Sequence, residues 1–314
     1  LAWAAGGNVA ATGDALTTNG SGNALNFDGV DDYVNVGASS PYFNTDLTVE
    51  AWVRTTDIRN GRDLVAWGNT DTCIGDNAQF RLDNGVLNFG MADVRGVTCG
   101  NYNNGWQSVV ASTSIATGDW THVAMVKSGS AITLYVNGQA VASGTINKAL
   151  SLNRMAIGSL FYAGSVVDDY LAGDLDEVRV WHTARTAAQI RQNMYRELGP
   201  TTGLVANYHF NESSGAAASD SSGNNLTGTL YNFPASPWRT SGAFAGPRQA
   251  LNFDGVDDYV NAGASSPAFS NNLTVEAWVR TTDTRTARDL VAWGNTDPCI
   301  GDNAQFRLDN GVLN

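Results

Sequence analysis

One long segment of this sequence occurs twice. Residues 24–88 return at residues 250–314, with an offset of 226 positions and with 56 of the 65 aligned residues identical. Two segments this similar are predicted to fold alike. The interval between them is about as long as one domain, so we interpret the chain as part of a tandem array of similar domains.

Short alternating segments between turn residues predict an all-β fold. Residues 47–54 (LTVEAWVR) place Leu47, Val49 and Val53 on one face, and Asn137-Gly138 separates two further apolar runs. The 34 glycines, together with abundant Asn, Asp, Ser and Thr, supply many tight turns. About a dozen such segments predict an antiparallel sandwich of two sheets.

A helical period occurs once, late in the repeat. In residues 186–198 (TAAQIRQNMYREL) the apolar residues recur at a spacing of three to four. Thr183 or Thr186 is a suitable N-cap, and Gly199-Pro200 ends the pattern. We therefore expect one short helix per repeat, followed closely by the next strand.

The charge balance limits the classes of partner. The net charge is −12, which disfavours nucleic acid and anionic membrane surfaces. No apolar run approaches the ~20 residues that a membrane-spanning helix needs. The chain begins at Leu1 rather than at Met, so we expect any export signal to lie outside it. A secreted or cell-surface protein fits this composition.

The cysteines predict one disulfide in each repeat. Cys299 is the copy of Cys73, and Cys99 lies beyond the stretch that the second copy reaches. The pair within one domain is then Cys73 with Cys99, a bridge worth about 3 kcal/mol that indicates an oxidising compartment. Zinc binding or redox catalysis is the alternative, but the chain has no Cys-x-x-Cys motif.

Several motifs in fixed order resemble a known family. They are LVANYHFNESSG, ALNFDGVDDYV, LTVEAWVR, DWTHVAMVK, ITLYVNGQ and GDLDEVRVWHTARTAAQI. This order is similar to that of laminin-G-like domains in the concanavalin A-like superfamily, which implies a jelly-roll sandwich. It also implies that a domain begins near Gly203. Residues 1–202 would then be one domain without its first strand, and residues 203–314 the N-terminal part of the next.

An acidic turn is a candidate metal site. Asp28, Asp31 and Asp32 crowd five positions, and carboxylates in loops are suitable ligands for Ca²⁺. The alternative is a solvated turn held by local hydrogen bonds. The family resemblance favours calcium, because bound Ca²⁺ is frequent in laminin-G-like domains.

A second acidic group could add ligands to this turn. It consists of Asp174, Asp176 and Glu177. Leu175 is out of phase with Val178 and Val180, so we expect a β-bulge near Asp176 and Glu177 that redirects a carboxylate. Asp28 and Asp176 are the ligands that we favour.

Aromatic residues in loops are candidate contact residues. They are Tyr102, Trp106, Phe161 and Tyr162. Aromatic rings beside amides can stack on sugars and bind hydroxyl groups. The alternatives are packing within a disulfide-pinned loop and contact with a neighbouring subunit.

These observations favour a non-catalytic structural protein. The three histidines are not clustered, and Glu50 is the only Glu in a clean strand pattern, so catalysis is not expected. We expect tandem domains that associate head to tail with other copies and form an extracellular fibre, sheath or adhesin stalk. The alternative is a multivalent carbohydrate-binding, lectin-like module.

Overall fold

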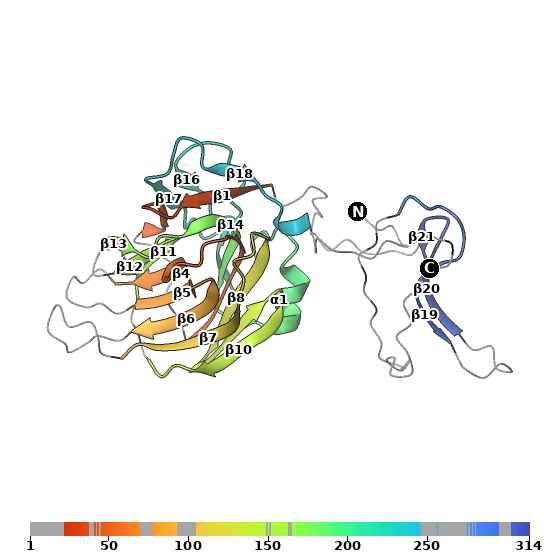
Figure 1. Cartoon of the computed structure of the whole chain (residues 1–314), viewed down its shortest axis with the longest axis horizontal. Coiled ribbons are helices and arrows are strands. Elements are labelled where there is room, and N and C mark those ends of the chain that lie inside the picture. The colour runs from red at the N-terminus through yellow and green to blue at the C-terminus, as the bar shows by residue number, and fades with distance from the viewer. Residues whose placement is uncertain are drawn as a thin grey trace. The chain divides into compact units, whose positions relative to one another are not determined.

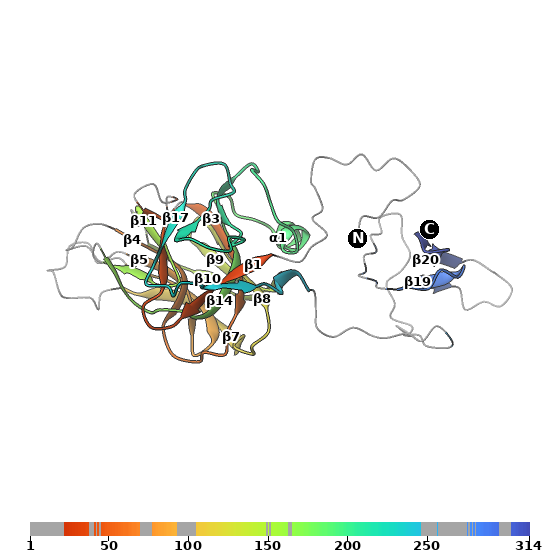
Figure 2. The ribbon, with the colours of Figure 1, turned by 90° about the horizontal axis from the view of Figure 1, so that it is seen from above.

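Antiparallel strands account for most of the described backbone, as the alternating pattern predicted (Figure 1 and, from above, Figure 2). The structure is a computed structural model that describes residues 22–37, 41, 43, 45–69, 77–92, 105–148, 150, 152–162, 165–245, 256, 275, 277, 279, 281–294 and 303–314. The chain divides into two units. One is Asn19–Arg248, and the other combines Leu1–Thr18 with Gln249–Asn314.

The first sheet of the larger unit has the strand order β10-β9-β8-β3-β14-β1-β18, and β15 also pairs with β14. Its strands are β1 (Asn23–Asp28), β3 (Asp46–Arg54), β8 (Thr121–Ser128), β9 (Ala131–Val136), β10 (Gln139–Thr145), β14 (Ala172–Trp181), β15 (Leu204–Tyr208) and β18 (Trp238–Thr240).

The second sheet has the order β16-β17-β2-β11-β4-β5-β6-β7. Its strands are β2 (Tyr33–Asn35), β4 (Arg62–Gly68), β5 (Asn77–Asp83), β6 (Val86–Ala92), β7 (Gln107–Ser114), β11 (Arg154–Ile157), β16 (Ala217–Ala218) and β17 (Gly228–Tyr231). A small hairpin joins β12 (Leu160–Tyr162) to β13 (Ser165–Asp168).

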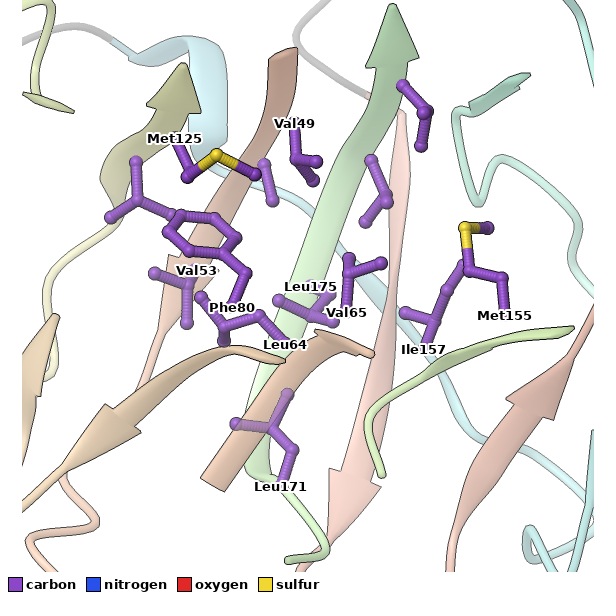
Figure 3. Packing of buried hydrophobic residues seen from close by; sticks show 14 of the residues in the cluster. Val49, Val53, Leu64, Val65, Phe80, Met125, Met155, Ile157, Leu171 and Leu175 are labelled. Carbon is purple, nitrogen blue, oxygen red and sulfur yellow. The ribbon is translucent and has the colours of Figure 1, made fainter. Parts of the chain in front are cut away.

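The core lies between the two sheets and is filled from both (Figure 3). Val49 and Leu175 come from the first sheet, and Val65 and Phe80 come from the second; all four are fully buried. Burying a side chain of this size stabilises a fold by about 1.5–3 kcal/mol. Two packed antiparallel sheets with one short helix confirm the predicted sandwich.

The helix forms where the spacing of apolar residues changes from alternation to a helical repeat. Helix α1 (Ala187–Asn193) has Thr186 as its N-cap, in a capping box with Gln189. Its buried residue Ile190 packs on Ala124 of β8, so α1 covers the outside of the first sheet. It ends earlier than the predicted range, at the C-cap Met194. Among the described residues, no helix is long and apolar enough to cross a membrane.

The predicted bulge is present in β14. The pairing of β14 with β3 shifts register between Asp176 and Arg179, and Glu177 adopts a left-handed backbone with φ 51°. One extra residue on β14 brings Leu175 and Val178 to the same face and turns the Glu177 side chain away from the core.

The segment from β15 to β18 completes the larger unit of this structure. Residues 203–314 were expected to begin the next domain. In the structure β15 pairs with β14, β17 with β2, and β18 with β1. The unit therefore runs to Arg248. The physical reason is burial, because Tyr208 and Phe210 of this segment lie in the shared core.

The second unit repeats part of the first. Its strands are β19 (Arg288–Gly294), β20 (Asn303–Asp309) and β21 (Val312–Leu313). The larger unit also contains a short 3₁₀ turn, Ala243–Ala245. The pair Arg288↔Leu308 repeats the register of Arg62↔Leu82, and the register shift that follows is also the same. The identical sequences thus give the same hairpin.

Candidate functional site

The outward face of β5 and β6 carries polar side chains in register. Along β5, Phe80 and Leu82 enter the core, so Gln79, Arg81 and Asp83 project from the opposite face. The neighbouring strand β6 places Asn88 opposite Arg81 and Gly90 opposite Gln79. Strand alternation therefore assembles guanidinium, carboxylate and amide groups on one surface.

These groups hold one another in fixed positions. Arg81 Nη1 donates to Gln79 Oε1 at 2.6 Å, and Arg81 Nε donates to Asp83 Oδ2 at 3.1 Å. Asn88 Nδ2 also donates to Asp83 Oδ2, at 2.5 Å, and the Gly61 amide donates to Asp83 Oδ1 at 3.0 Å. The polar array is thus preorganised before any ligand arrives.

Trp106 covers this array. The centre of its ring lies 4.9 Å from the Arg81 guanidinium carbon, a cation–π contact, and the residue is 40% exposed. A Cβ atom at Gly90 would collide with Cζ2 of the ring, so the ring can lie against the sheet because position 90 is glycine. Together, Gln79, Arg81, Asp83, Asn88, Gly90 and Trp106 form what we call the Trp106 surface, in which Gln79 and Asn88 are buried and support the more exposed members.

A buried acid borders the Trp106 surface. Asp63 on β4 pairs across the strand with Arg81 and is fully buried, and neither of its carboxylate oxygens has a hydrogen-bond partner. Burial raises the pKa of Asp63 well above its ordinary value, and the charge of Asp169 adds to this. A protonated, neutral Asp63 is therefore favoured at this edge of the surface.

The other predicted aromatic residues do not join this surface. Phe161 is only 4% exposed and packs against Gly68, so it is a buried residue and not an open contact, which corrects the prediction. Tyr102 and the side chain of Tyr162 lie outside the described residues, as do Cys73 and Cys99 with their predicted disulfide.

The three carboxylates of the turn at Asp28–Asp32 lie close together in the structure. Carboxylate oxygens of Asp28, Asp31 and Asp32 lie within 4.8 Å of one another. Asp28 Oδ1 accepts the Val30 amide at 2.7 Å, and Asp32 Oδ2 accepts the Asp28 amide at 2.9 Å. Asp32 is fully buried, and burial is the main cause that raises its pKa to about 6.

The turn fits a hard divalent cation. The buried Oδ1 atom of Asp32 has no hydrogen-bond partner. An oxygen-only donor set with one unsatisfied buried oxygen suits Ca²⁺, which prefers carboxylates and carbonyls.

The second acidic group does not join the turn. Each member has a partner of its own: Asp174 pairs with Arg54 at 2.7 Å, and Asp176 Oδ2 accepts the Ser241 hydroxyl at 2.5 Å. Glu177 binds Arg179 at 2.5 Å and His209 at 2.7 Å. The bulge does redirect Glu177, but toward these cations. The expected ligand pair of Asp28 with Asp176 is therefore not formed.

Glu50 is also unavailable to a ligand. It lies fully buried on the first sheet, 3.6 Å from Arg185 Nη1 and 3.5 Å from His122 Nε2. Burial raises the pKa of Glu50, although Arg179 and Arg185 oppose this shift.

A known family shares this sandwich. The family model described as the concanavalin A-like lectin/glucanases superfamily matches residues 28–191. No curated protein sequence matches the chain.

Solved structures with a similar fold include a Bacteroides ovatus protein described as a candidate carbohydrate-binding protein. It has 20% sequence identity and a TM-score of 0.51, and the match covers 70% of this chain and 60% of that one, less than two thirds of the relative. A CBM40 module of a Ruminococcus gnavus sialidase, bound to α2,3-sialyllactose, has 11% identity and a TM-score of 0.44, with 55% and 98% covered. A SAP-like pentraxin of Limulus polyphemus has 19% identity and a TM-score of 0.41, with 55% and 81% covered. Identities this low concern the fold alone.

Proposed function

The chain belongs to the concanavalin A-like lectin/glucanases superfamily, and we propose that it is a non-catalytic carbohydrate-binding protein whose ligand stacks on the Trp106 surface. The observation that carries this proposal is the Trp106 ring, which lies over Arg81 and remains 40% exposed. The carbohydrate-binding description of the Bacteroides ovatus relative supports it.

The chemistry of the surface suits a sugar. The C–H face of a pyranose packs on an indole ring, and the partly exposed side chains of Arg81 and Asp83 beside it meet its hydroxyl groups. Gln79 and Asn88 are buried, and they hold Arg81 and Asp83 in place. The Arg81 guanidinium is already engaged by Gln79 and Asp83, and it increases the polarity of the site without offering an isolated charge. A neutral oligosaccharide is therefore the ligand class that we propose.

The proposal that the protein does not catalyse hydrolysis rests on its carboxylates. Glycosidases need two carboxyl groups that face the sugar across about 5–9.5 Å. Glu50 is buried against Arg185 and His122, and Asp83 is held by Arg81 and Asn88. Neither is placed to serve as a free acid or nucleophile.

Removal of the Trp106 ring tests the carbohydrate proposal. The full chain would be screened against neutral oligosaccharides, and the affinity for the best ligand measured by calorimetry. Trp106→Ala should weaken binding about tenfold, since an aromatic stacking contact is worth up to ~1.5 kcal/mol. The matched control is Tyr231→Ala, which removes another exposed aromatic side chain from the same sheet. Equal affinities for wild type and Trp106→Ala would refute the proposed site.

We also propose that the Asp28–Asp32 turn binds Ca²⁺ and that the protein works outside the cell. The unsatisfied Asp32 oxygen supports the first statement. The acidic composition and the predicted Cys73–Cys99 bridge support the second.

A structural or adhesive role is the second candidate. It rests on the near-identity of residues 24–88 and 250–314, which suits tandem domains that display several copies of one surface. The sequence alone favoured the structural or adhesive role. The family and the description of the Bacteroides ovatus relative favour carbohydrate binding instead.

A further inference from the structure

The segment from β15 to β18, residues 204–240, is held by three different strands. Its β15 pairs with β14, β17 pairs with β2, and β18 pairs with β1, so it lies on both sheets of the sandwich. We call this segment the closing segment. The strands β14, β1 and β2 together form its acceptor.

The closing segment makes specific contacts as well as ladder pairs. Tyr231 stacks on Tyr33 with ring centres 5.0 Å apart, and Phe233 meets Phe27 edge-on at 5.1 Å. His209, just after β15, binds Glu177 at 2.7 Å. These contacts make the segment part of the core rather than a loosely attached tail.

Two of the three acceptor strands, β1 from its second residue onward and β2, occur twice in the sequence. Residues 24–35 (ALNFDGVDDYVN), which contain most of β1 and all of β2, are identical to residues 250–261. The acceptor residues that pair with β17, namely Tyr33, Val34 and Asn35, recur as Tyr259, Val260 and Asn261. The closing segment therefore stands between two identical copies of the strands that it pairs with.

The sequence of the third acceptor strand, β14, occurs once. Strand β14 has the sequence AGDLDEVRVW at Ala172–Trp181, and this sequence is not repeated in the 314 residues. Residues 250–261 thus repeat the sequence of β2 and of β1 from Ala24 onward, but not the sequence of β14. The complete acceptor is available in this sandwich and in a second copy of the same chain.

The connection to the closing segment permits an exchange. Residues 194–203 link α1 to β15, and Gly203 has a left-handed backbone with φ 85°. A change of backbone dihedrals in such a link redirects the strands that follow, while every contact within the sandwich can be re-formed with an identical partner.

We propose that the closing segment is exchangeable, so that residues 204–240 of one chain can complete the sandwich of a second copy of this chain. The duplicated β1–β2 sequence favours this, because residues 250–261 carry the same strand sequence that β17 and β18 pair with in residues 24–35. The proposal concerns association between copies and does not depend on carbohydrate binding at Trp106.

Paired cysteines on separate chains test the exchange. Thr229 of β17 lies opposite Asn35 of β2 and is exposed. Full-length chains carrying Asn35→Cys or Thr229→Cys, both with Cys299→Ser, would be mixed, refolded together and oxidised. Exchange predicts a disulfide-linked heterodimer of twice 33.2 kDa. The control partner is Ser213→Cys, which is exposed and lies outside the paired strands of the segment.

The dependence on concentration supplies the second readout. A tethered segment has an effective concentration in the millimolar range, so tenfold dilution during refolding should lower the heterodimer yield about tenfold. In a single chain with both cysteines, the internal crosslink should not change. A heterodimer yield no greater than that of the Ser213→Cys control would overturn the proposal.

Discussion

Gly90→Ala isolates the position of the Trp106 ring from the chemistry of its neighbours. Gly90 does not have a left-handed backbone, so alanine costs nothing in backbone strain. The added methyl group would collide with the indole ring and nothing polar is removed. Because the ring is on a partly exposed side chain, we expect it to swing away while the fold persists.

The expected magnitudes follow from the contacts. Loss of the 4.9 Å contact with Arg81 costs about 0.5–1 kcal/mol, the usual range for an exposed cation–π pair. A loss of 1 kcal/mol lowers Tm by about 2–4 °C in a unit of this size. Arg81 keeps its bonds to Gln79 and Asp83, so no larger effect is expected. Affinity for the oligosaccharide should fall about as far as in Trp106→Ala, near tenfold.

The indole resonance of Trp106 in ¹⁵N NMR spectra, assigned with Trp106→Phe, reports the position of the ring. Gly90→Ala should shift this resonance, and it should add no further loss of affinity to Trp106→Ala. The control is Gly199→Ala, where a methyl group meets nothing within 4 Å. An unshifted resonance with unchanged affinity in Gly90→Ala would refute the described packing and its role in binding.

Three further predictions concern charge. Because burial raises the pKa of Asp32 to about 6 in the folded state, its contribution to stability is full below the ordinary value of 3.8 and is lost as pH rises through 6. In chelator, Tm should therefore gain more on acidification in wild type than in Asp32→Asn; equal gains would contradict this. Ca²⁺ should raise Tm in wild type and in the control Asp119→Asn but not in Asp28→Asn, and a chelator without effect on wild type would remove the calcium proposal. Burial alone lowers the pKa of His209, but the hydrogen bond and charge of Glu177 raise it above the ordinary 6.5, so its stabilisation is present at low pH and is lost as pH rises past the folded value. The protection of the β15 amides, taken relative to their intrinsic exchange rate at each pH, should fall across that range in wild type and show no such step in His209→Gln.

The architecture was predictable because it depends on local patterns. Alternation sets which residues of each strand enter the core, as in residues 47–54. The spacing of Thr186 and Gln189 specifies a capping box. Leu175 and Val178 are three residues apart, so both can face the core only if β14 contains a bulge between them, as it does. Each of these features is decided by residues close in sequence.

The site was predictable only in part, because it depends on pairing between distant strands. Trp106 is recognisable as an exposed aromatic residue, but Arg81 and Gly90 belong to the site through the register of β5 and β6. One signal was available, since a glycine within an alternating strand marks a close approach.

Local sequence does not specify which partner a side chain or strand selects in the folded protein. The acidic group around Asp176 was expected to join the Asp28 turn at one ion, and in the structure Glu177 binds Arg179 and His209. The domain boundary, predicted near Pro200, depends on a similar choice of partner. Identical sequences at residues 24–35 and 250–261 offer the closing segment two places, and strand propensity cannot distinguish them.

Chemical-shift mapping with a bound neutral oligosaccharide tests the central claim most directly. The account predicts that the largest changes fall on the Trp106 indole and on the Arg81 guanidinium, which are the exposed and partly exposed groups of the surface. Changes confined to other parts of the sandwich, or none with any oligosaccharide tested, would contradict carbohydrate binding at the Trp106 surface.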